Sequence, residues 1–154
     1  ACDNYLILRT AWLYGANGKN FIRTILGNIL NEPDTRLKIV NDQYGSPTWS
    51  YQLALQIDRL LTSSATGIYH ASAEGYCTWY DLAVALFREF DLTGPITACP
   101  TSAYPTPAVR PPNSILDNHR LKSENRNVME HWQSALKAFI KTHGRQLLAE
   151  LNRI

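Results

Sequence analysis

Cysteines are scarce in this sequence, and hydrophobic residues never gather into a long run. The 3 cysteines, Cys2, Cys77 and Cys99, are odd in number, far apart and outside any C-x-x-C arrangement, so neither a disulfide framework nor a thiolate metal site is expected. No apolar run approaches the ~20 residues of a membrane span, and the first residues lack the basic-then-apolar pattern of a signal peptide. We therefore expect a protein of the reduced cytoplasm, with no membrane partner.

An excess of one charge is also missing. The 15 basic and 13 acidic residues leave a net charge of +2, which gives no bulk attraction to nucleic acid and predicts no nucleic-acid partner. A serine-hydrolase G-x-S-x-G elbow is absent as well. The 4 histidines form no i,i+4 pair and no cluster with cysteine, so no metal is expected at His70, His119, His131 or His143. Any bound anion must be held by local contacts.

The pattern of apolar residues predicts a globular α/β fold. With 154 residues, 45% hydrophobic and 18% charged, the chain is long enough for one compact domain with a core. Strand-like and helix-like spacings alternate along it. Strands are expected at 5–8, 37–40 and 67–71, the first of them buried. Helices are expected at 21–31, 53–61, 78–90 and from 132 onward, with Gly144 as a place where the last helix could restart.

Local signals refine this outline. Thr78, followed three residues later by Asp81, predicts a capping box at the third helix. The second helix is expected to bury a stripe on one face, formed by Leu53, Ile57, Leu60 and Leu61. From 98 to 113 the prolines predict irregular backbone, because each proline removes a donor and fixes φ.

Residues 15–20, Gly-Ala-Asn-Gly-Lys-Asn, place a glycine-rich turn and a lysine between a strand and a helix. A Walker A loop needs four residues between its glycines and a Ser or Thr after the lysine. Here two residues intervene and Asn20 follows Lys19, so this is not a phosphate-binding loop of that type. Asn20 is expected to cap the helix that follows.

Two further segments are rich in polar side chains. Asp42 to Thr48 offers a carboxylate, an amide and a hydroxyl, which suit sugar hydroxyls or a base edge; an Asx-type turn with Thr48 capping the next helix explains it equally well. Arg110 lies between prolines, and its guanidinium matches a diphosphate in a bidentate fork. A solvated surface arginine, or a polyproline ligand for another module, remains an alternative for that segment.

Taken together and in order, the motifs of this chain resemble dTDP-4-dehydrorhamnose reductases, a family of extended short-chain dehydrogenases. The combination is specific and covers nearly the whole chain, although each piece alone is not specific. The matching segments are R-T-A-W-L-Y-G at 9–15, Asn20-Phe21, V-N-D-Q-Y-G-S-P-T at 40–48, G-I-Y-H at 67–70, T-W-Y at 78–80, 104–114, Leu116-Asp117, and Trp132 with Leu136.

This resemblance implies both a fold and a set of site residues. Residues 1–154 would be the C-terminal part of a Rossmann-type reductase: the substrate-binding half, with the last parallel strands of the Rossmann sheet near 5–9 and 67–71, and without the N-terminal dinucleotide-binding part. Trp12 would lie at the substrate, and Thr10 and Ala11 near the nicotinamide. The residues expected to line the nucleotide-sugar cleft are Asn20, Asp42, Gln43, Tyr104, Arg110 and Asn113.

The catalytic signature of that family is absent from these residues. The family transfers hydride from NADPH or NADH to a C4 keto sugar, with a tyrosine as proton donor and a lysine four residues later. None of the 8 tyrosines here has a lysine at that offset, and G-x-G-x-x-G is also missing. In the family both motifs lie upstream of the segment at 9–15. We expect the C-terminal half of such an enzyme, beginning inside the helix after the tyrosine, with no tight cofactor binding and no catalysis of its own.

Two function classes stay open at this point. The first is an oxidoreductase that acts on a dTDP-keto-deoxyhexose, represented here by its substrate half, with the missing N-terminal half as its partner. The second is a non-catalytic binding or regulatory protein on the same scaffold, like the regulatory β subunit of methionine adenosyltransferase. A homo-oligomer is compatible with either class.

Overall fold

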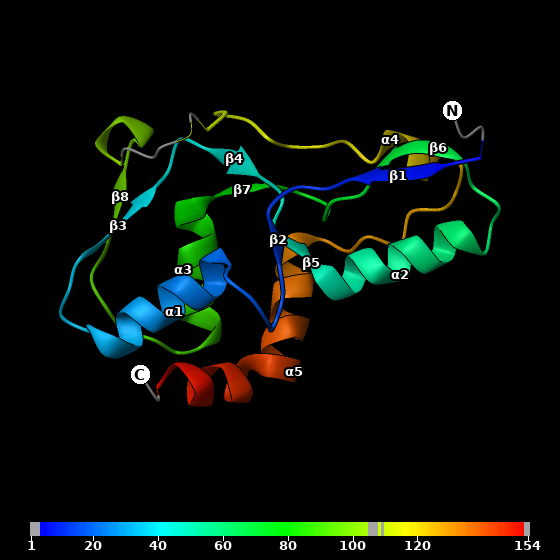
Figure 1. The fold of residues 1–154 in the computed structure, drawn as a ribbon. Coiled ribbons are helices and arrows are strands. Elements are labelled where there is room, and N and C mark those ends of the chain that lie inside the picture. The colour runs from blue at the N-terminus through cyan, green and yellow to red at the C-terminus, as the bar shows by residue number, and fades with distance from the viewer. Residues whose placement is uncertain (1–3, 105–107, 109, 153–154) are drawn as a thin grey trace.

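A computed structural model describes residues 4–104, 108 and 110–152, and it shows an α/β chain (Figure 1). Four of the helices have ten or more residues, whereas all strands are short. The strands are β1 (Leu6–Arg9), β2 (Leu13–Tyr14), β3 (Leu37–Val40), β4 (Tyr44–Gly45), β5 (Thr48–Trp49), β6 (Gly67–His70), β7 (Cys77–Thr78) and β8 (Ile96–Cys99). The helices are α1 (Phe21–Asn31), α2 (Ser50–Leu61), α3 (Trp79–Glu89), the 3-10 turn η1 (Thr101–Ala103), α4 (His119–Ser123) and α5 (Trp132–Leu151).

The described strands pair two by two. β1 pairs with β6, β2 with β5 and β3 with β8, all in parallel, whereas β4 and β7 are antiparallel. Parallel pairs joined through helices are the arrangement expected of an α/β fold, so the predicted class is confirmed.

Two hydrophobic clusters hold the elements together. In Figure 1, α1, α3 and α5 gather on one side of the molecule, and β1 with β6 extends above α2 on the other side. The larger cluster joins the three gathered helices through residues that include Ile22, Leu26, Leu86, Leu136 and Phe139. The smaller cluster joins the β1–β6 pair to α2 and α4.

The helix starts follow the sequence signals. The side chain of Asn20 accepts a hydrogen bond from the backbone N–H of Arg23, which confirms Asn20 as the N-cap of α1. Thr78 and Asp81 exchange both bonds of a capping box at α3, as predicted. α5 runs through Gly144 without a break, and a Cβ at this position would lie 3.1 Å from Phe90 and 3.2 Å from Ile140.

The strand expected at Tyr5–Leu8 is observed at Leu6–Arg9, but its predicted burial is wrong for the described chain. Ile7 is 48% exposed, and its register partner Ile68 is 40% exposed. The opposite face, with Leu6 and Leu8, packs on the smaller cluster. Only β6 pairs with β1 among the described residues, so one face and one edge of this strand stay open.

The expected stripe on α2 is also wrong in part. Leu60 is fully buried, but Ile57 and Leu61 face outward, and Gln52 and Gln56 are buried in their place. Gln56 faces inward because it forms two hydrogen bonds there. Its side-chain amide donates to the carbonyl of Arg126 and accepts from the N–H of Val128. The backbone groups of Arg126 and Val128 therefore bind Gln56 and hold that face of α2 inward.

Two expectations about irregular segments need correction. Residues 98–99 belong to β8, and 101–103 form a 3-10 turn, because Pro95 and Pro100 flank the strand and do not interrupt its ladder. Thr48 does not cap α2. Its hydroxyl donates to the carbonyl of Ser46 and accepts from the N–H of Ala73, and the N-cap position is occupied by Trp49.

Candidate functional site

The candidate site is built around a stack of two tryptophans. The ring centroids of Trp12 and Trp79 lie 3.5 Å apart with an interplanar angle of 6°, and Phe21 adds a tilted contact to Trp79 at 4.7 Å. These rings come from the β1–β2 connection and from the starts of α3 and α1. Gly45 lies so close to Trp12 that a Cβ there would come within 2.2 Å of the indole. The aromatic faces are thus fixed by packing from three segments.

A chain of hydrogen bonds leads away from this stack. The indole N–H of Trp79 donates to Gln43 Oε1 at 3.2 Å, and Gln43 Nε2 donates to Thr101 Oγ1 at 3.0 Å. Thr101 in turn donates from its backbone N–H to both carboxylate oxygens of Asp42, at 2.9 and 3.0 Å, and from its hydroxyl to Asp42 Oδ1. Every amide or carboxylate group of Asp42 and Gln43 therefore has a protein partner.

These bonds also set the charge of the site. The hydroxyl and then the backbone N–H of Thr101 hold the pKa of Asp42 below its usual range, because both stabilise the ionised carboxylate. Asp42 therefore stays negative over a wider pH range than a free aspartate. A fixed carboxylate and a buried amide define one wall of the site next to the tryptophan stack.

The segment 110–114 runs beside this wall. The N–H of Tyr44 donates to the carbonyl of Pro112 at 2.8 Å, and the N–H of Ser114 donates to the carbonyl of Tyr44 at 2.9 Å. Asn113 is thereby paired in parallel with Tyr44, and its side chain accepts from the N–H of Ile115. Arg110, just before this pairing, is exposed. Segment 110–114 thus adds exposed polar side chains to the wall formed by Asp42 and Gln43.

The remaining predicted site residues lie around this group. Thr10 and Ala11 follow β1 directly, and Thr10 Oγ1 is buried without a hydrogen-bond partner among the described residues. Tyr104 ends the 3-10 turn and is 52% exposed. Asn20 is different, because its side chain is engaged with the carbonyls of Gly15 and Gly18 and with the α1 N-terminus. The structure therefore brings Asp42, Gln43 and Trp12 together, with Asn20 serving the helix start.

Sequence reasoning missed two members of this group. Neither Trp79 nor Thr101 is among the site residues that the sequence predicts. The signal for Trp79 was available, because T-W-Y at 78–80 is one of the segments that carry the resemblance. Nothing local to Thr101 indicates its role, since Asp42 is 59 residues away in sequence.

Among the described residues, Cys77 and Cys99 are free and buried, and burial, followed by the charge of Asp81, raises the pKa of the Cys77 thiol to about 12. No group of histidine, cysteine and carboxylate residues in the described ranges is arranged to hold a metal ion. None of the helices described has the length and apolar character needed to cross a bilayer.

Comparison with known structures first defines the class of the fold. The chain superposes on the UDP-glucose 4-epimerase of Thermus thermophilus, in a complex with NAD, with a TM-score of 0.71 at 16% identity, over 92% of this chain and 47% of that one. At that identity the similarity concerns the fold alone. The fold is that of the Rossmann-type reductases and epimerases, as expected from the sequence.

The chain belongs to the family of the RmlD substrate binding domain, whose model matches residues 1–145. It is 38% identical to the spore coat polysaccharide biosynthesis protein SpsK of Bacillus subtilis, over 88% of this chain and 46% of SpsK. It is 36% identical to the dTDP-4-dehydrorhamnose reductase of Escherichia coli K12, over 90% of this chain and 50% of that protein. The resemblance found in the motifs is confirmed.

Solved structures agree with this membership. A dTDP-4-dehydrorhamnose reductase from Clostridium acetobutylicum matches with a TM-score of 0.84 and 38% identity, over 90% of this chain and 48% of that one. The enzyme of the same name from Bacillus anthracis, in complex with NADP, matches with a TM-score of 0.84 and 31% identity, over 91% and 49%. The chain thus spans about half the length of the relatives it matches.

Proposed function

We propose that this chain is the substrate-binding half of a dTDP-4-dehydrorhamnose reductase. The intact protein would reduce the C4 keto group of dTDP-4-dehydro-L-rhamnose to dTDP-L-rhamnose, using NADPH or NADH. The observation that carries this proposal is the tryptophan stack with its hydrogen-bonded wall, found in a chain 36% identical to the Escherichia coli enzyme of that name. Residues 1–154 would form the substrate half, with β1 and β6 contributing to the Rossmann sheet.

The role proposed for each residue depends on whether its side chain is already hydrogen-bonded within the protein. Trp12 offers an apolar surface to the sugar end, and the exposed Arg110 offers a guanidinium for the diphosphate. Tyr104 and Asn113, both exposed, extend the same side of the cleft. Asp42 and Gln43 would act mainly by orienting their neighbours, because their polar groups are already engaged.

The residues present fit a nicotinamide cofactor at one point. The hydroxyl of Thr10, which has no hydrogen-bond partner in the part of the chain that the structure describes, lies directly after a parallel strand, where open α/β sheets bind their ligands. When bound, the cofactor supplies the hydride. Thr10 and Ala11 would hold its nicotinamide ring, and Trp12, the next residue in the chain, would hold the sugar.

This proposal assigns the remaining chemistry to residues outside this chain. No tyrosine here has a lysine four residues later, so in this proposal the proton for the new hydroxyl would come from a residue outside this chain. The test is consumption of NADPH or NADH by the full-length protein that contains this chain, dependent on the keto sugar. An alternative regulatory protein would bind the nucleotide sugar without consuming the cofactor.

A further inference from the structure

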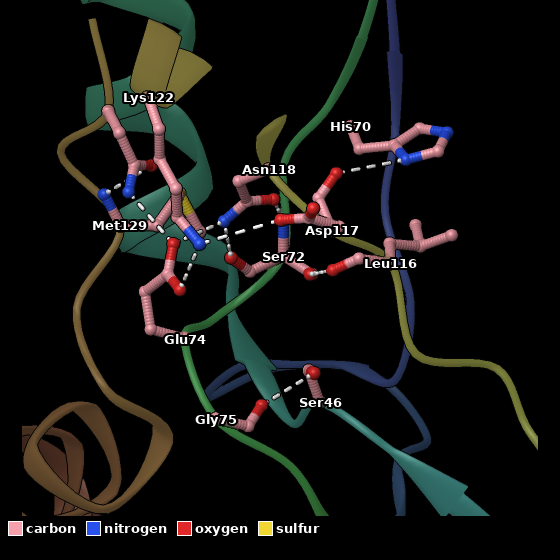
Figure 2. A network of polar contacts seen from close by, with 11 residues as sticks. Ser46, His70, Ser72, Glu74, Gly75, Leu116, Asp117, Asn118, Lys122 and Met129 are labelled. Carbon is pink, nitrogen blue, oxygen red and sulfur yellow. Dashed lines mark hydrogen bonds and ion pairs between the residues drawn. The ribbon is translucent and has the colours of Figure 1, made fainter. Parts of the chain in front are cut away.

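The loop after β6, residues 71–76, is held from several sides by polar contacts that the proposed site does not use (Figure 2). Ser46 Oγ donates to the carbonyl of Gly75 at 2.7 Å, which ties the loop to the β4–β5 connection. The backbone of Glu74 accepts from the N–H of Trp132 and donates to the carbonyl of Glu130. The third side of the loop is closed by Asn118, just before α4.

Asn118 pairs with this loop like a strand neighbour. Its Oδ1 accepts from the N–H of Ser72 at 3.1 Å, and its Nδ2 donates to the carbonyl of Ser72 at 2.7 Å and to Glu74 Oε1 at 2.9 Å. The side chain is 2% exposed. A buried amide whose groups are all paired has one orientation available, so its backbone is fixed as well.

The carboxylate of Glu74 supports Asn118 from below. Its Oε1 also accepts from Asn127 Nδ2 at 2.8 Å, and its Oε2 forms an ion pair with Lys122 Nζ at 2.8 Å. Figure 2 shows the side-chain nitrogens of Lys122 and Asn118 on the same side of the Glu74 carboxylate, each joined to it by a dashed line. Asn118 and Asn127 therefore donate to the same oxygen, but from different parts of the chain.

These contacts act on the segment from Pro112 to Asp117. Its first half is attached to β4 through the pairing of Pro112 and Ser114 with Tyr44. Its second half is attached by Asn118 and by Ser72 Oγ, which donates to the carbonyl of Leu116 at 3.2 Å. A segment held at both ends loses little conformational freedom when a ligand binds to it, whereas a segment held at one end must be ordered.

We propose that Asn118 is a positioning residue for substrate binding. It fixes the segment 112–117 between β4 and the loop after β6, and so presents Asn113 to the nucleotide sugar without touching it. This inference rests on the function proposed above for the same cleft, and it adds to that function a residue outside the cleft.

The chain offers a matched pair of variants for the test. Asn118→Ala and Asn127→Ala each remove an amide donor from Glu74 Oε1, but only Asn118 is bonded to Ser72 and precedes α4. In the full-length protein, Asn118→Ala should raise the KM for the keto sugar roughly tenfold, with kcat within about twofold, since an ordering cost is added to binding. Asn127→Ala should leave the KM unchanged.

Amide hydrogen exchange measures how well the segment is ordered in the absence of substrate. In Asn118→Ala the backbone amides of Ser114 and Ile115 should exchange hydrogen faster, and in Asn127→Ala they should keep their protection. Ser72→Ala is a milder variant, because it removes only the bond to the carbonyl of Leu116. It replaces Asn118→Ala if that variant does not fold. It should shift KM and exchange in the same direction by a smaller factor.

The same experiments can overturn the inference. Equal KM shifts in Asn118→Ala and Asn127→Ala would mean that the network only stabilises the fold, and so would a drop in kcat at constant KM. Unchanged amide exchange in Asn118→Ala and Ser72→Ala would equally contradict it. If the unmutated protein fails to turn over the keto sugar, the proposed function falls, and the exchange measurement then decides the positioning role by itself.

Discussion

At the scale of single residues, Trp12 adopts a backbone conformation that tryptophan rarely takes. Its φ is +48°, in the left-handed region, which costs on the order of 1–3 kcal/mol for a bulky residue. The parallel stack on Trp79, worth about 0.5–1.5 kcal/mol, and the bond from the Thr48 N–H to the Trp12 carbonyl offset part of that cost. Because Trp12 is expected to contact the substrate, its strained backbone is consistent with a functional role for the position of its ring.

Gly45 should tolerate no side chain, because a Cβ would come within 2.2 Å of the Trp12 ring. We expect Gly45→Ala to displace Trp12 from the stack and to lower the free energy of unfolding by ~1–3 kcal/mol. Near-ultraviolet circular dichroism of the tryptophans and urea unfolding measure the two effects. Gly27→Ala is the control, since a Cβ there meets only Leu151 at 3.8 Å. Equal spectra for Gly45→Ala and the unmutated protein would show that the stack does not depend on this glycine.

Arg110 should serve substrate binding far more than the chemical step. Loss of a charge-assisted, bidentate contact to a diphosphate costs ~1.5–3 kcal/mol of binding. Arg110→Ala in the full-length protein should therefore raise the KM for the nucleotide sugar strongly and leave kcat nearly unchanged. Arg59→Ala, at an exposed arginine of α2, is the matched control. An unchanged KM in a folded Arg110→Ala protein would reject this role.

At the scale of elements, α3 carries Trp79 on its first turn, so the capping box at its start also holds the site. Thr78→Ala removes the acceptor for the Asp81 N–H and should lower the free energy of unfolding by ~1 kcal/mol. Chemical denaturation compares it with Thr142→Ala, whose hydroxyl bonds back to Ala138 on the exposed side of α5. The control should change stability by less than the cap variant. If both variants lose a similar free energy of unfolding, the capping box adds no stability beyond that of an exposed threonine.

The same elements show how far sequence reasoning reaches. The starts of α1 and α3 were predictable, because Asn20 and the Thr78–Asp81 pair act within three residues. The inward face of α2 was not, since the partners of Gln56 lie about 70 residues later in the chain. At the site, Trp12 and Gln43 could be found from their motifs. Their contact through Trp79 depends on three segments meeting in space, which no local pattern contains.

At the scale of the whole molecule, the β1–β6 pair is unfinished within the described residues. Its outward face carries Ile7 and Ile68, and β1 has no neighbour on its other side among the described strands. Open strand edges and apolar faces favour association. We propose that the missing half covers this surface in the intact protein.

The isolated 154-residue chain should therefore self-associate, exchange this strand or depend on the missing half for solubility. Sedimentation equilibrium at micromolar concentration measures this. Ile7→Lys with Ile68→Lys should weaken association, whereas Leu61→Lys, at a residue 66% exposed on α2, should not. A monomer with one cooperative melting transition would contradict the expectation, because it would show that the open strand does not drive assembly.

In the proposed function, these residues hold the nucleotide sugar, whereas catalysis needs the other half of the enzyme. The most direct measurement is the oxidation of NADPH or NADH in the presence of dTDP-4-dehydro-L-rhamnose, made on the full-length protein and on the 154-residue chain. We expect turnover by the full-length protein and none by the chain, because near-attack geometry needs cofactor and substrate held together. Turnover by the chain alone, or none by a folded full-length protein that binds the sugar nucleotide, would contradict this division of roles between the two halves.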